Sequence, residues 1–156
     1  MLDLERLTTQ ELSTLGRYAA EECERRFRGI AAASDQADAA LQELLREMAD
    51  EAGYQVEAPA EEDRRLPFGS GRRMSPDGVR EFLRASLPSL AKSFGEGTLH
   101  RDIAMFYAES LEEEATRFYR MLAEHSHEAG TRSRFVDLSD RERGKLRFLR
   151  EVVLQG

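Results

Sequence analysis

The chain has little cysteine and no long apolar run. A single cysteine, Cys23, excludes an intramolecular disulfide and any iron or zinc centre that needs four cysteine ligands. No apolar stretch approaches the ~20 residues that a membrane-spanning helix requires. The charged start Met1-Leu2-Asp3-Leu4-Glu5-Arg6 also lacks the apolar segment of a signal peptide. We therefore expect a cytoplasmic protein without a membrane partner.

Histidine is scarce, and basic residues are outnumbered by acidic ones. The 156 residues include three histidines, and 23 Lys and Arg against 30 Asp and Glu give a net charge of −7. Such a charge makes nucleic acid an unsuitable partner. The segment Gly69-Ser70-Gly71-Arg72-Arg73 lacks the Lys-Ser/Thr ending of a phosphate-binding loop.

No segment alternates apolar and polar residues with the period of a strand, so the sequence predicts an all-α fold. The length predicts a single domain over 1–156. Within it we expect a helix pair over 8–57, a crossover over 58–97 with a short extra helix, and a second helix pair over 98–154. A crossover of that length allows the second and third long helices to run parallel.

Local signals indicate where several helices begin. Thr8-Thr9-Gln10-Glu11 has the spacing of a capping box. Ser75-Pro76-Asp77 predicts the short helix of the crossover, with serine as the cap and proline at the first helical position. Either Ser34 or Asp35 is expected to cap the second long helix. The apolar face of the third long helix is expected to include Ile103, Phe106 and the residues at helical spacing after them.

The two halves of the chain resemble each other. The segment from Glu21 to Phe27 has a counterpart from Glu112 to Phe118, in which each glutamate precedes a phenylalanine by the same number of positions. A helix pair used twice predicts a four-helix bundle with a pseudo-two-fold axis. It also places one glutamate of each copy in equivalent positions.

These repeated segments resemble the rubrerythrin branch of the ferritin-like superfamily, above all in Glu112-x-x-Ala115-x-x-Phe118-Tyr119. The resemblance implies a ferritin-like four-helix bundle that holds two irons. One glutamate would come from each of helices one and three, and a Glu-x-x-His pair from each of helices two and four. The corresponding metal positions of this chain are Glu21, Glu112, Glu142 and Gln55. The activity implied is peroxide reduction or iron oxidation.

The chain departs from that pattern at the histidines. In the fourth helix the glutamate is present as Glu142, but Lys145 stands where the histidine is expected. In the second helix the two ligand positions read Ala52 and Gln55, or Glu51 and Tyr54 if the frame slides by one residue. The chain's histidines, at positions 100, 125 and 127, are expected at the ends of the third helix, and thirteen residues at about 1.5 Å each put His125 about 20 Å from Glu112.

Lysine is protonated at neutral pH, so it is a poor ligand but can replace the charge of a metal. Lys145 is expected either to form a buried ion-pair cluster with the glutamates or to reach the surface with a simple pair to Glu142. Two functions remain open. One is a metal-free or weakly metal-binding bundle with a binding or structural role. The other is a di-iron carboxylate oxidoreductase with an unusual ligand set and iron as its cofactor. A homodimer is compatible with both, and the single cysteine excludes a rubredoxin-like electron donor within the chain.

Overall fold

The computed structural model describes residues 2–57 and 74–155, apart from the side chains of 54–57 and 153–155. Its four long helices are α1 (Thr9–Ala33), α2 (Ala39–Glu57), α5 (Arg101–Glu124) and α6 (Ala129–Gln155). Its short elements are the 3-10 helices η1 (Leu4–Arg6) and η3 (Pro88–Ala91) and the helix α4 (Pro76–Ser86). The described residues contain no strand, only an isolated bridge between Ser34 and Leu99. The predicted all-α class is confirmed.

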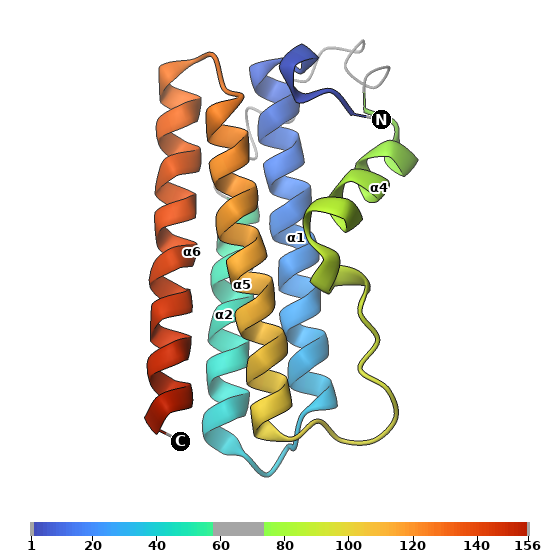
Figure 1. Cartoon of the computed structure of the whole chain (residues 1–156), viewed down its shortest axis with the longest axis vertical. Helices are drawn as coiled ribbons and strands as arrows, with labels where there is room; N and C mark the ends of the chain where they lie inside the picture. The colour runs from blue at the N-terminus through green and yellow to red at the C-terminus, as the bar shows by residue number, and fades with distance from the viewer. Residues whose placement is uncertain (1, 58–73, 156) are drawn as a thin grey trace.

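The four long helices lie side by side, and the described part of the crossover, residues 74–97, passes along the outside of α1 (Figure 1). Packing is most extensive between α5 and α6 and between α1 and α2, and α1 also contacts α5. In Figure 1, α2 and α5 run in the same direction, whereas α1 and α6 run in the opposite one. This parallel course of α2 and α5 is the one that the long crossover predicts. The segment 58–73, the first part of the predicted crossover, lies outside the described residues.

Two helix starts follow the predicted capping chemistry. The Thr8 hydroxyl accepts a hydrogen bond from the Glu11 amide at 3.1 Å, and the Glu11 carboxylate accepts one from the Thr8 amide at 2.9 Å. The Ser75 hydroxyl accepts a hydrogen bond from the Gly78 amide at 3.0 Å, with Pro76 at the first helical position of α4. Both caps satisfy amides that have no partner inside their own helix.

The predicted cap of the second long helix is wrong. Asp38, directly before α2, accepts a hydrogen bond from the Leu41 amide at 3.1 Å. Ser34 instead donates its hydroxyl hydrogen to the Ile30 carbonyl at the end of α1, and Asp35 accepts from the Ala37 amide in the turn. All three residue types can cap a helix, and the geometry of the α1–α2 turn selects among them.

The predicted apolar face of the third long helix is wrong at its first residues. Ile103 and Phe106 are 45% and 59% exposed. The buried stripe of α5 starts at Ala104 and continues through Ala108 and Leu111. The two exposed side chains therefore lie beside this stripe and not on it.

The second half of the crossover is attached to α5 by a buried carboxylate. The Glu114 side chain accepts hydrogen bonds from the Ser89 amide at 2.7 Å and from the Ser89 hydroxyl. Both residues are buried. These bonds tie η3, and with it the end of α4, to the third long helix.

Replacing Glu114 tests how much this attachment contributes. We expect Glu114→Ala to lower the free energy of unfolding by about 2 kcal/mol, because it leaves the buried Ser89 amide and hydroxyl without their acceptor. The neighbouring Glu113→Ala is the matched control, and its exposed side chain predicts a change within about 0.5 kcal/mol. Urea-induced unfolding measures both, and equal losses in the two variants would contradict the role given to Glu114.

Candidate functional site

A lysine lies between two carboxylates where α2 and α6 face each other. The Lys145 ammonium is 3.2 Å from the Glu142 carboxylate, one turn earlier on α6, and 3.1 Å from the Glu51 carboxylate on α2. The side chain of Glu142 is 5% exposed, that of Lys145 13% and that of Glu51 60%. Lys145 therefore links a buried carboxylate to one at the surface.

A second carboxyl group lies deeper in the same place. Glu112 on α5 is fully buried, and neither of its carboxyl oxygens accepts a hydrogen bond from a donor of the described residues. Its neighbour is the carboxyl group of Glu142, and two ionised carboxylates offer each other no donor. Burial and then the charge of Glu142 raise the pKa of Glu112 well above 4.5. Burial therefore favours the protonated form of Glu112 more than in a free carboxyl group, and that form can donate a hydrogen bond to Glu142.

The ammonium of Lys145 remains charged in this setting. Burial alone would lower the pKa of Lys145, but the charges of Glu142 and Glu112 outweigh burial and the pKa is raised. The Lys145 ammonium and the Glu142 carboxylate, 3.2 Å apart, compensate each other's charge. This pairing offsets part of the cost of placing ionised groups in the interior.

Cys23 and Tyr119 lie beside these charges. Both are buried. Burial, followed by the charges of Glu142 and Glu112, raises the pKa of the Cys23 thiol well above 9.0. Burial also raises the pKa of Tyr119, and Cys23 and Glu142 add to the effect. Both groups are therefore neutral at physiological pH, and a protonated buried thiol is a poor nucleophile.

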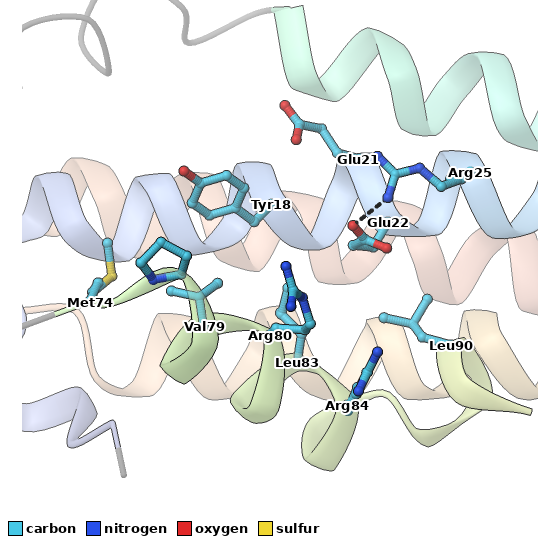
Figure 2. Close-up of a pocket in the computed structure, with 11 residues that line it drawn as sticks. Tyr18, Glu21, Glu22, Arg25, Met74, Val79, Arg80, Leu83, Arg84 and Leu90 are labelled. Carbon is cyan, nitrogen blue, oxygen red and sulfur yellow. Dashed lines mark hydrogen bonds and ion pairs between the residues drawn. The ribbon is translucent and has the colours of Figure 1, made fainter. Parts of the chain in front are cut away.

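The structure places Glu21 away from this cluster. Glu21 is half-buried and lines a groove between α1 and α4, where its carboxylate points away from α4 (Figure 2). The residues of α1 that are buried around it are Ala20 and Cys23. Successive side chains on a helix point about 100° apart around its axis. If the buried face of α1 is displaced by one position relative to that of α5, Glu21 lies outside the interior although Glu112 lies inside it.

The second helix contributes Glu51. Glu51 is the first ligand position when α2 is aligned with the Glu-x-x-His pair of the family with a shift of one residue. The other frame places Ala52, which is buried and has no ligand atom, and Gln55, whose side chain lies outside the described residues. The buried stripe of α2 runs through Leu41, Leu45, Met48 and Ala52, so Glu51 reaches Lys145 from the edge of that face.

The histidines lie at the ends of α5, as predicted. His100 is the residue before the helix, His125 is the residue after it, and His127 is exposed in the turn that follows. Within the described part of the chain, no group of three or more His, Cys, Asp or Glu side chains is arranged to hold a metal ion. Over the same residues, no helix is both long enough and apolar enough to cross a membrane.

No model of a known protein family, no curated protein and no solved structure matches this chain.

Glu112 should make the stability of the protein depend on pH. Its pKa is higher in the folded state than in the unfolded state, so its stabilising contribution is complete below about pH 4.5 and is lost as the pH rises toward the folded value. Because Gln does not titrate, we expect Glu112→Gln to become more stable relative to the wild type by up to about 1.4 kcal/mol per pH unit above about pH 5. Urea-induced unfolding between about pH 5 and pH 8 measures this difference. The exposed Glu113→Gln should show a constant difference, and a constant difference for Glu112→Gln would contradict the raised pKa of Glu112.

We expect the positive charge of Lys145 to contribute strongly to the free energy of unfolding. Lys145→Met removes the cation beside the buried Glu142 carboxylate, and we expect a loss of about 3 kcal/mol. The exposed Lys92→Met should change stability by less than about 0.5 kcal/mol. The double variant Lys145→Met/Glu142→Gln should recover part of the loss, since it buries no carboxylate charge at position 142. Thermal and urea unfolding compare the three variants, and a Lys145→Met as mild as Lys92→Met would disprove the role of the charge.

Proposed function

We propose that this chain is a ferritin-like four-helix bundle of the rubrerythrin branch in which a lysine takes the place of the metal charge. It then serves as a binding or structural protein without a di-iron centre. Three features support the proposed fold: the parallel course of α2 and α5, the long crossover between them, and the Glu-x-x-Lys spacing of Glu142 and Lys145 on α6. The homodimer and the cytoplasmic location remain predictions.

The position of the Lys145 ammonium is the observation that carries this proposal. It lies 3.2 Å from the Glu142 carboxylate, and its charge also acts on the fully buried Glu112. A cation that binds between these carboxyl groups has to displace the ammonium and has to compete with a proton for Glu112, whose pKa is raised. Both steps cost free energy, so the cluster in its present form opposes metal binding.

The donor set also fits a di-iron centre poorly. Two irons need several anionic oxygens for charge balance and further ligands to complete their shells. The cluster offers the carboxyl groups of Glu112 and Glu142 in the interior and that of Glu51 at the surface. At the remaining interior positions α1 provides Ala20 and Cys23, and α2 provides Ala52. We therefore derive no redox step through iron.

The second candidate is a protein that binds metal weakly, or a di-iron oxidoreductase with an unusual ligand set. The observation that favours it is Glu112, whose two carboxyl oxygens accept no hydrogen bond from any donor in the described residues. If the Lys145 side chain moved toward the surface, a cation could contact Glu112, Glu142 and Glu51. Gln55 remains a predicted ligand in this case.

Iron loading with a matched variant distinguishes the two candidates. After aerobic reconstitution with Fe(II) we expect the wild type to retain no stoichiometric iron and to show no near-ultraviolet absorption of a di-iron(III) centre. Lys145→Ala removes the ammonium and leaves an excess of negative charge, so it should bind divalent cations more tightly than the wild type and gain thermal stability when Mn²⁺ is added. Two tightly bound irons per wild-type chain would overturn the proposal in favour of the di-iron oxidoreductase.

A further inference from the structure

A groove on the outer side of the bundle is separate from the lysine cluster, which consists of Lys145, Glu142, Glu112 and Glu51. It lies between α1 and α4, has a volume of about 440 Å³ and is open to solvent (Figure 2). A volume of this size suits a small organic molecule. Residues of α1 form one wall, and α4 with the following η3 forms the other.

The floor of the groove is apolar. Val79 and Leu83 of α4 are buried against the bundle, and Leu90 of η3 closes one end of the groove. Tyr18 of α1 and Met74 lie toward the other end (Figure 2). The exposed Tyr18 and the half-buried Met74 and Leu90 leave apolar area that the aliphatic part of a ligand can remove from water.

The rim of the groove carries an excess of guanidinium groups. Arg80 and Arg84 are one turn apart on α4, and both side chains extend toward α1 (Figure 2). Arg80 is 3.7 Å from the carboxylate of Asp77, whose side chain is 95% exposed and therefore well screened. The structure gives Arg84 no hydrogen bond or ion pair with any described residue.

The acidic residues of the groove offset little of this charge. Glu22 is paired with Arg25 at 2.7 Å, so these two side chains neutralise each other on the α1 wall. Glu21 points its carboxylate away from α4 (Figure 2). Arg80 and Arg84 are thus the groups available to a ligand above the apolar floor.

We propose that this groove binds a small organic anion with one anionic head group and a short aliphatic body. The head group would contact Arg80 and Arg84, and the body would cover Val79 and Leu83. The net charge of the chain is −7, so its overall field repels anions, and any preference for an anion has to come from these local arginines. The groove shares no residue with the lysine cluster, so anion binding in the groove and metal exclusion by the cluster are independent of each other.

Octanoate tests the proposal, with three analogues that each remove one feature. Acetate has only the head group, octanol only the apolar body, and octylammonium has the same body with the opposite charge. Calorimetric titration of the full chain should show saturable binding of octanoate and binding at least about tenfold weaker for each analogue. Amide chemical shifts should change at Val79 and Leu83 on α4. No octanoate binding, or equal binding of octylammonium, would overturn the proposal.

Paired arginine variants locate the binding. Arg80→Gln/Arg84→Gln should weaken octanoate binding by at least about tenfold, because it removes both charge-assisted contacts. Arg143→Gln/Arg147→Gln removes two exposed arginines at the same spacing on α6 and should leave binding unchanged. All four arginines are exposed, so circular dichroism should show both variants folded. Equal effects of the two pairs would mean that octanoate responds only to net charge, and the groove would then not be the site.

Discussion

The Lys145 ammonium lies between a buried carboxylate and an exposed one, and the polar interior of the four long helices is organised around it. Ionised groups in a protein interior are tolerated only when opposite charges compensate each other at short distance. Here Glu142 comes from the same helix as Lys145, Glu51 from α2 and Glu112 from α5. The pairing therefore constrains the rotation and the axial position of three helices relative to one another.

One consequence is that the ionisable groups of the interior act on one another. Lys145 is paired with two carboxylates at 3.1 and 3.2 Å, and the pKa values of Glu112, Cys23 and Tyr119 are all raised. The groove between α1 and α4 lies on the outside of the bundle, where the Ser89–Glu114 contact holds the crossover in place.

Much of the fold could be predicted from the sequence because the relevant signals are local. The capping box at Thr8 and the Ser-Pro pair at Ser75 each involve only neighbouring residues, and the structure has both helix starts where they were predicted. The predictions failed where the choice depended on a neighbouring helix. Asp38 caps α2 because the α1–α2 turn positions it there. Phe106 lies outside the core because the buried stripe of α5 runs through Ala104, Ala108 and Leu111.

The sequence by itself determined the all-α class and the Glu142–Lys145 pair, since residues three apart on a helix lie on one face whatever surrounds them. Only the tertiary structure decided which other groups join that pair. Glu21 and Glu112 occupy equivalent places in the two similar segments, yet one faces the outer groove and the other is fully buried. The contact of Glu51 with Lys145 and the raised pKa of Glu112 were decided in the same way. Each depends on how the helices are rotated about their own axes, and that rotation is set by packing between segments far apart in the chain.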